Sequence, residues 1–177
     1  MPLASPRETT DNQGHEIAAR RVGARPYVSL PDAGRRAVRW CALSDAAPAF
    51  EMAIAVEPAD IDELGHVNNV VYLRWVQDIA VAHWRAAASR DDQEKLVWIV
   101  VRHEIDYKRA TRLGDGIVAR TWVGAATRIK FERHTELLRA SDGCLLAKAR
   151  TVWCPIDAVT GKPTSVSAAV RAAFSVS

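Results

Sequence analysis

The amino-acid sequence predicts an α+β domain in which one antiparallel sheet packs against a single long helix. Five segments carry apolar residues at every second position, which is the period of a strand with one buried face. One longer segment instead shows the 3.6-residue period of an amphipathic helix. The order is one strand, the helix and then four strands, which differs from the alternating strands and helices of a parallel sheet.

The first strand is predicted to begin near residue 50, where apolar side chains start to alternate with small or charged ones. Its buried face consists of Phe50, Met52, Ile54 and Val56. After a polar stretch, a helix is expected over residues 67–89. Its apolar face consists of Tyr72, Trp75, Val76, Ile79, Ala82, His83 and Ala86. At 1.5 Å per residue such a helix is about 33 Å long, enough to cross a whole sheet.

Four further strands are predicted after the helix, from alternation in residues 97–107, 117–123, 127–139 and 145–153. The apolar face of the first of these strands consists of Val97, Ile99, Val101, His103, Ile105 and Tyr107. Turn-forming runs follow the first and the third strand, at Gly114-Asp115-Gly116 and Ser141-Asp142-Gly143. Such turns predict hairpins, so we expect the four strands to be neighbours in chain order.

The composition is that of one packed domain. The chain has 177 residues, of which 49% are apolar and 25% are charged. Its net charge of +3 is too small and too evenly spread to indicate nucleic-acid binding. The longest apolar run, residues 96–101, is far shorter than the roughly 20 residues that span a bilayer, and the N-terminus shows no signal pattern. We therefore expect a cytoplasmic protein without a membrane or nucleic-acid partner.

Residues 1–47 differ from the rest, because they combine scattered Pro and Gly with little apolar periodicity. We interpret them as a flexible N-terminal arm, and residues 48–177 as the folded domain. Three cysteines, Cys41, Cys144 and Cys154, are odd in number and lack the spacing of a zinc motif. They indicate small core side chains rather than a disulfide framework.

The densest polar cluster lies between the first strand and the helix, in residues 60–69. It contains Asp60, Asp62, Glu63 and His66, immediately before the expected helix start. Acidic groups and a histidine can supply a base, while the free backbone N–H groups of a helix start can stabilise a developing oxyanion. This combination makes the segment the candidate active site.

Other interpretations of the cluster explain less of it. A helix cap formed by Asp60 or Asn68 accounts for one residue but not for the whole cluster. A calcium-binding EF-hand loop is disfavoured because Leu64 and Val71 occupy two of its ligand positions. A transition-metal site would lack a fourth ligand. The sequence contains no nucleophile elbow and no phosphate-binding glycine loop, so we expect neither a metal nor a cofactor.

A resemblance to a known family is carried by residues 60–75, which read DIDELGHVNNVVYLRW. They resemble the D-x-D-x-x-G-H-V-N-N-x-x-Y-L-x-W signature of hotdog-fold acyl-CoA thioesterases, the 4-hydroxybenzoyl-CoA thioesterase-like family. Residues 105–115 and 160–163 are similar to later passages of that family, so the resemblance extends from about residue 50 to 174. It implies a hotdog fold, in which the sheet wraps around the long helix. It also implies a homodimer or a dimer of dimers, with active sites at the subunit interface.

The resemblance further implies roles for single residues. Asp62, the second aspartate of the motif, would attack the thioester or activate water, and Asp60 would be structural. Backbone amides near Asn68 and Asn69 would form the oxyanion hole, so the implied catalytic residues are Asp62, His66 and Asn69. Two roles stay open for His66, which either exchanges a proton or only shapes the loop.

Substrate contacts are expected from Asn68, Tyr72, Arg128 and Lys130. Arg128 and Lys130 are predicted on the charged face of the sheet, where they would meet the phosphates of coenzyme A. The predicted function is the hydrolysis of an acyl-CoA or acyl-carrier-protein thioester to a free acid and a thiol, without a cofactor. Two alternatives stay open: a non-catalytic hotdog protein that binds acyl-CoA, and a hotdog hydratase or dehydratase.

Overall fold

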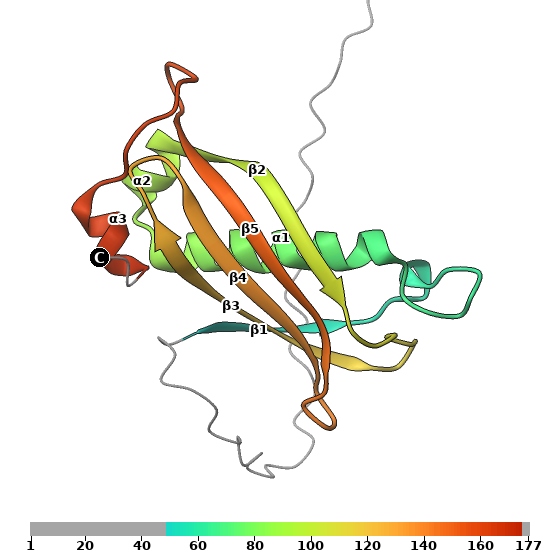
Figure 1. Cartoon of the computed structure of the whole chain (residues 1–177). Helices are drawn as coiled ribbons and strands as arrows, with labels where there is room; N and C mark the ends of the chain where they lie inside the picture. Colours follow the sequence, from blue (N-terminus) through green and yellow to red (C-terminus); the bar gives the residue numbers. More distant parts are fainter. Residues whose placement is uncertain (1–48, 175–177) are drawn as a thin grey trace, which may run out of the picture. The chain divides into compact units, whose positions relative to one another are not determined.

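The computed structural model describes residues 49–174, so the predicted N-terminal arm and Cys41 lie outside the described residues. Within this range five strands form one antiparallel sheet, and one long helix lies along it (Figure 1). The strands are β1 (Phe50–Ala55), β2 (Leu96–Tyr107), β3 (Gly116–Ala126), β4 (Phe131–Arg139) and β5 (Leu145–Asp157). The helices are α1 (Asn69–Ala87), α2 (Arg90–Lys95) and α3 (Ala168–Ala173), with a 3₁₀ turn η1 (Pro58–Asp60) after β1. This arrangement confirms the predicted α+β class.

The strand order in the sheet is β1-β3-β4-β5-β2. Strands β3, β4 and β5 are neighbours in chain order, but β2 is not a neighbour of β3, so the expected order of the four later strands is wrong. β2 pairs with β5 along its length and occupies one edge of the sheet. The run Gly114-Asp115-Gly116 leads into β3 without pairing β3 with β2, so the hairpin predicted there is wrong. The hairpin between β4 and β5 is confirmed, and Gly143 in its turn has a φ of 69° that favours glycine.

A β-bulge in β2 changes which side chains of that strand face the helix. The register against β5 shifts between Val100 and Arg102. Trp98 before the shift and Ile105 after it both pack against the core, although their numbers differ in parity. The exposed apolar side chains of this strand include Val97, Ile99, Val100 and Val101. Of the predicted apolar face of β2, Ile105 therefore packs against the core, whereas Val97, Ile99 and Val101 do not.

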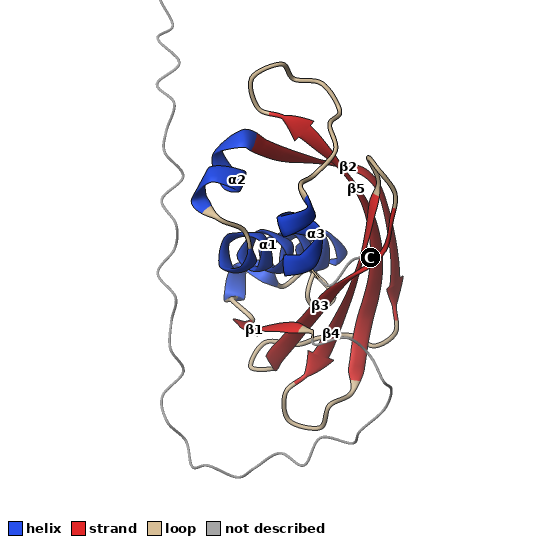
Figure 2. Ribbon diagram, turned by 90° about the vertical axis from the view of Figure 1, so that its left-hand side faces the viewer, coloured by secondary structure: helices blue, strands red, loops and turns tan. Residues whose placement is uncertain are grey.

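Helix α1 lies on the concave side of the sheet, as Figure 2 shows, and falls inside the predicted range 67–89. Its buried side chains recur at helical spacing and are Val71, Tyr72, Trp75, Val76, Ile79 and Ala80. Val71, Tyr72, Trp75 and Ile79 share one apolar cluster with three strand residues, Ile117, Leu137 and Leu146. Burial of a large apolar side chain stabilises a fold by about 1.5–3 kcal/mol. These contacts fix the start of α1 beside the loop that precedes it.

Two short helices that the periodicity of the sequence did not predict surround the C-terminal end of α1 (Figure 1). Ser89 and Ser167 are the N-caps of α2 and α3, each accepting a backbone N–H with its hydroxyl. After α3, Phe174 stacks on Trp84 of α1 with ring centroids 5.8 Å apart. A second apolar cluster therefore forms here, apart from the one at the start of α1.

Candidate active site

Asp60 anchors the segment between β1 and α1. Its side chain is only 2% exposed, and its Oδ1 forms an ion pair of 2.6 Å with Arg74 of α1. Its Oδ2 accepts the backbone N–H of Glu57 at 3.0 Å. The Asp60 carbonyl accepts the backbone N–H of Asn68 at 2.9 Å. These contacts join the beginning of the segment to its end and to the helix, which supports the structural role expected for Asp60.

Asp62 lies partly buried in a tight turn that its own carboxylate closes. Its Oδ1 accepts the backbone N–H of Leu64 at 2.9 Å and that of His66 at 3.3 Å. The Asp62 N–H in turn donates to the His66 carbonyl at 2.8 Å. Gly65 completes the turn with a φ of 73°, where other residues would be strained. Oδ2 of Asp62 accepts no hydrogen bond from residues 49–174, so one carboxylate oxygen is held and the other is available.

Helix α1 begins with a backbone N–H that has no partner among the described residues. Asn68 is the N-cap, and its Oδ1 accepts the N–H of Val70 at 3.0 Å. The N–H of Asn68 donates to Asp60, and the N–H of Val71 donates to the Asn68 carbonyl. The N–H of Asn69 therefore donates to no described residue, and it lies at the positive end of the dipole of a 19-residue helix.

A shallow cavity of about 360 Å³ brings four of the predicted residues together. These residues are Asp62, His66, Asn69 and Tyr72. The cavity wall also includes Tyr107, Lys108, Arg109 and Ala110, to which sequence reasoning assigned no role. They belong to the later passage that resembles the family, and that resemblance was the available signal. Spacing could not place them here, because Tyr107 is 38 positions from Asn69 in the chain.

Two tyrosines join this later passage to α1. The Tyr107 hydroxyl donates to the carbonyl of Asn69 at 3.1 Å, and burial together with the neighbouring Tyr72 raises the pKa of Tyr107. The Tyr72 hydroxyl donates to Oγ1 of Thr111 at 2.8 Å and accepts the Thr111 N–H at 3.1 Å. The two rings meet edge to face at 5.3 Å. Because its hydroxyl is engaged, Tyr72 has only its ring to offer a ligand.

His66 contributes to the site in two separate ways. Its main chain shapes the Asp62 turn through the hydrogen bonds given above. Its imidazole lines the cavity and makes no hydrogen bond to residues 49–174. Loop shaping therefore does not require the imidazole, and proton exchange by the ring stays a prediction. The side chain of Asn68 acts as the helix cap, and its contact with substrate stays a prediction as well.

Arg128 and Lys130 lie in the turn between β3 and β4. The backbone N–H of Thr127 donates to the Lys130 carbonyl at 2.7 Å, and β4 begins only at Phe131. The prediction that these two cations lie on a strand face is therefore wrong. The β1–α1 loop follows the opposite end of β3, where Ala55 pairs with Gly116. The 11 residues of β3 at 3.3 Å each span roughly 35 Å, so one chain does not bring the two cations to Asp62.

Two classes of feature are not found within the described range. No helix between residues 49 and 174 is long and apolar enough to cross a membrane. In the same part of the chain, no group of three or more His, Cys, Asp or Glu side chains is placed to hold a metal ion.

Solved structures share the fold at low sequence identity. A 1,4-dihydroxy-2-naphthoyl-CoA thioesterase from Synechocystis matches with a TM-score of 0.64 at 19% identity, over 72% of this chain and 96% of that one. A thioesterase from Thermus thermophilus, crystallised with coenzyme A and Zn, matches with a TM-score of 0.62 at 23% identity, over 70% and 90% of the two chains. The probable thioesterase YbaW from Escherichia coli matches with a TM-score of 0.63 at 20% identity, over 70% of this chain and 94% of that one. These likenesses confirm the predicted hotdog fold.

Sequence comparisons agree with the structural ones. The chloroplastic palmitoyl-acyl carrier protein thioesterase of Gossypium hirsutum is 24% identical over 105 residues, which is 54% of this chain. The chain spans about a quarter of the length of that relative. The model of the thioesterase-like superfamily matches residues 56–174, a range that includes the whole candidate site. Because this match covers more than half of the sequence, the chain belongs to the thioesterase-like superfamily.

Proposed function

We propose that the protein is a cytoplasmic enzyme that hydrolyses acyl thioesters to a free acid and a thiol. The observation that carries the proposal is that the Asp62 carboxylate and the start of α1, with the unused N–H of Asn69, line one cavity. Hydrolysis of a thioester needs a group that attacks the carbonyl carbon or activates water, and a donor for the carbonyl oxygen. The thiol leaves readily, so the two groups supply what the reaction requires.

Asp62 acts as the nucleophile or as the general base. The two backbone donors on Oδ1 hold the carboxylate in one orientation. Oδ2 is then free to attack the thioester carbon, or to take a proton from a water molecule that attacks it. Both versions use the same oxygen and the same orientation of the loop.

The backbone N–H of Asn69 acts as the oxyanion donor. Asn69 thus contributes through its main chain, as the resemblance implies for the start of the helix. Negative charge that develops on the carbonyl oxygen is stabilised by this N–H and by the positive end of the α1 dipole. The hydrogen bond from Tyr107 to the Asn69 carbonyl fixes the orientation of the first turn of the helix.

The substrate is a thioester of a pantetheine arm, which coenzyme A and acyl carrier protein share. The curated relative is named for a carrier-protein thioester, and two of the structural relatives are named with coenzyme A or a CoA thioester. Arg109 lines the site and forms no ion pair with a described residue, whereas Lys108 pairs with Asp106 at 3.3 Å. Arg109 then contacts a phosphate that coenzyme A or the carrier protein attaches to the arm. Arg128 and Lys130 meet the same substrate only if a second subunit brings them there.

The protein functions as a homodimer or a larger homo-oligomer. β2 pairs with β5 on one side, and no described strand pairs with its other edge. The strand is 12 residues long, and Val97, Ile99 and Val101 are each at least half exposed. A long apolar edge strand of this kind is a template for pairing with another strand. Pairing of β2 with its counterpart in a second copy covers these side chains.

A panel of acyl-CoA and acyl-pantetheine thioesters, assayed for thiol release, tests the proposal. We expect release with the wild-type protein and none above background with Asp62→Asn. Binding of acyl-CoA without thiol release by either protein would instead favour a non-catalytic binding role. Addition of water to an unsaturated acyl thioester, with the thioester intact, would favour a hydratase.

A further inference from the structure

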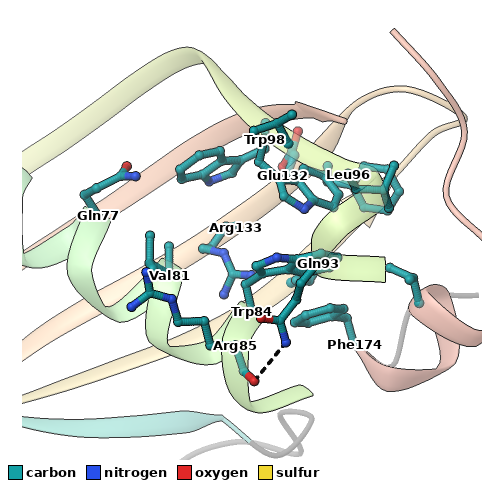
Figure 3. A pocket seen from close by; sticks show the side chains of 16 residues that line it. Gln77, Val81, Trp84, Arg85, Gln93, Leu96, Trp98, Glu132, Arg133 and Phe174 are labelled. Carbon is teal, nitrogen blue, oxygen red and sulfur yellow. Dashed lines mark hydrogen bonds between the residues drawn. The ribbon is translucent and has the colours of Figure 1, made fainter. Parts of the chain in front are cut away.

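A second cavity, of about 430 Å³, lies at the opposite end of α1 from Asp62. Residues of α1, α2, β2, β3, β4, β5 and the α3 region line it (Figure 3). From Asn69 to Trp84, which lines this cavity, α1 rises by about 22 Å. Gln93 of α2 donates from Nε2 to the carbonyls of Arg85 at 3.2 Å and Ala88 at 2.8 Å, which holds α2 against the end of α1. The volume is in the usual range for a small-molecule site.

Among the described residues, five aromatic rings line this cavity. They are Trp84, Trp98, Phe131, Trp153 and Phe174. Trp98 meets Trp84 and Phe131 edge to face at 5.5 Å and 5.2 Å, and Phe174 stacks on Trp84. These ring contacts give the cavity an aromatic, largely apolar wall. The body of a ligand that fills the space is therefore planar and apolar.

Arg133 of β4 places a charged group in this aromatic surrounding. Figure 3 shows its side chain in the middle of the lining, and the residue is only 8% exposed. Its Nη1 donates to Nδ1 of His83 at 3.0 Å and to Oγ1 of Thr121 at 3.2 Å. Neither partner carries a charge at neutral pH. Thr121 offers a hydroxyl, and burial, together with the charge of Arg133, lowers the pKa of His83 to about 4. The N–H groups on Nη2 and Nε donate to no residue in the described range.

The charge of Arg133 is not neutralised inside the cavity. Among the described residues that line the cavity, Glu132 alone is acidic, and its carboxylate already forms an ion pair with Arg150. Arg85 adds a second positive charge at the lining. A buried cation is costly unless an anion or further acceptors pair with it. The cavity therefore has an electrostatic preference for a negatively charged ligand group.

Two tryptophans of the same wall carry unsatisfied indole N–H groups. Nε1 of Trp98 and Nε1 of Trp153 are buried and have no hydrogen-bond partner among residues 49–174. Buried polar groups in folded proteins are nearly always hydrogen-bonded, so unmet donors in a cavity wall are unusual. Arg133 thus lies in a wall that is rich in aromatic rings and contains two unsatisfied indole donors.

We propose that this cavity is a binding site for a carboxylate with a planar aromatic body, held by the guanidinium of Arg133. The free N–H groups on Nη2 and Nε form a fork that matches two carboxylate oxygens. The aromatic body of the ligand packs against Trp84, Trp98 and Phe174. The site does not include Asp62 or the start of α1, so it stands whether or not the protein hydrolyses thioesters.

Titration calorimetry with 2-naphthoate and with its uncharged counterpart 2-naphthamide tests the site. We expect the full-length protein to bind the acid at least about tenfold more tightly than the amide, the ratio that one charge-assisted hydrogen bond produces. Asp62→Asn should bind both ligands as the wild type does, which separates this test from the test of hydrolysis. Equal affinity for the two ligands, or no binding of either, would overturn the proposal.

Three variants locate the binding. Arg133→Gln should remove the preference, so that the acid and the amide bind with about equal affinity. Arg102 is an exposed arginine of β2 outside the lining, and Arg102→Gln should leave the preference for the acid unchanged. Val81→Phe fills the cavity without removing Arg133 and should weaken the acid and the amide equally. If Arg133→Gln does not fold, Val81→Phe still tests whether the ligands bind in this cavity. Unchanged binding by Val81→Phe would overturn the proposal.

A final comparison separates two sources of the carboxylate. A thioester whose acyl chain is long enough to reach from Asp62 to the cavity, and ends in an aromatic carboxylate, is compared with its methyl ester as a substrate. If the acyl group occupies the cavity, Arg133→Gln raises KM for the carboxylate form only. If a separate aromatic acid occupies it, Arg133→Gln loses 2-naphthoate binding and leaves both KM values unchanged. Either result supports the site.

Discussion

The hydroxyl of Tyr107, at the end of β2, donates a hydrogen bond of 3.1 Å to the main-chain carbonyl of Asn69, the first residue of α1. The bond joins an edge strand to the helix start whose N–H faces the proposed reaction site. Burial and Tyr72 raise the pKa of Tyr107, so the phenol remains a donor at neutral pH. The position of the proposed oxyanion donor thus depends on a residue outside the loop that carries Asp62.

Replacement of Tyr107 by Phe should lower kcat for thioester hydrolysis by about two- to tenfold, because a positioning contact of about 0.5–1.5 kcal/mol is lost. Tyr107 is 45% exposed, so the melting temperature should change little. The matched control is Tyr72→Phe, whose buried hydroxyl serves Thr111. It should mainly lower stability, by about 1–3 kcal/mol. Equal loss of activity in the two variants would contradict the positioning role.

Asp62→Asn should abolish thioester hydrolysis and leave the fold intact, because the amide keeps the shape but loses the charge that the reaction needs. Asp60→Asn should show the reverse. Asp60 is buried against Arg74, and its substitution should cost about 1–3 kcal/mol of stability while retaining turnover. Circular dichroism melts and steady-state rates measure both effects. Near-normal turnover by folded Asp62→Asn would refute the assignment.

Light scattering should give at least twice the 19.5 kDa of one chain. Ile99→Lys places a charge on the exposed apolar edge strand and should shift the protein toward monomer and reduce activity. Val159→Lys is the control, because Val159 is 93% exposed in the turn after β5 and should have no effect. An active wild-type monomer would show that the edge strand has another partner or none.

Contacts with the phosphates of coenzyme A should appear in KM. Arg109→Ala should raise KM several-fold for a CoA thioester and less for the matching pantetheine thioester, which lacks those phosphates. Each exposed charge contact contributes about 0.5–1 kcal/mol, so the difference should shrink as the salt concentration rises. The double variant Arg128→Ala with Lys130→Ala should show the same pattern only if a second subunit completes the site. Equal losses on both substrates would indicate damage to the cavity.

The stability of the protein should fall in mild acid because of His83. Burial, and then the charge of Arg133, lowers its pKa from 6.5 to about 4. Between these pH values the unfolded chain binds a proton that the folded chain does not, so the free energy of unfolding decreases as the pH falls from about 6.5 to about 4. Above this range the effect is absent. His83→Gln should flatten this part of the melting-temperature profile, and an unchanged slope would assign the effect to other groups.

The local sequence determined the active-site loop and the start of α1. The hydrogen bonds that shape the Asp62 turn join it to Leu64 and His66, and the cap joins Asn68 to Val70. Such contacts depend on residues within four positions of one another. The motif could therefore be recognised, and Asp60 could be separated from Asp62, before any packing was known.

The tertiary structure decided which strand β2 pairs with and where its side chains point. Alternation shows that a strand has one buried face, but it does not identify the neighbouring strand. Pairing with β5 moves β2 to the sheet edge, and the bulge between Val100 and Arg102 reverses the faces within one strand. The same pairing carries Tyr107 and Arg109 to the candidate active-site cavity.

Arg133 shows the limit of sequence reasoning most clearly. On the sequence it is one more charged residue in an alternating strand, and such residues are usually exposed. In the fold it is buried against His83, which is 50 positions away in the chain, and it faces a cavity between α1 and the sheet. The composition and periodicity of the chain determined that a helix lies on a sheet. Packing alone decided what that helix covers, because burial depends on residues that are distant in the sequence.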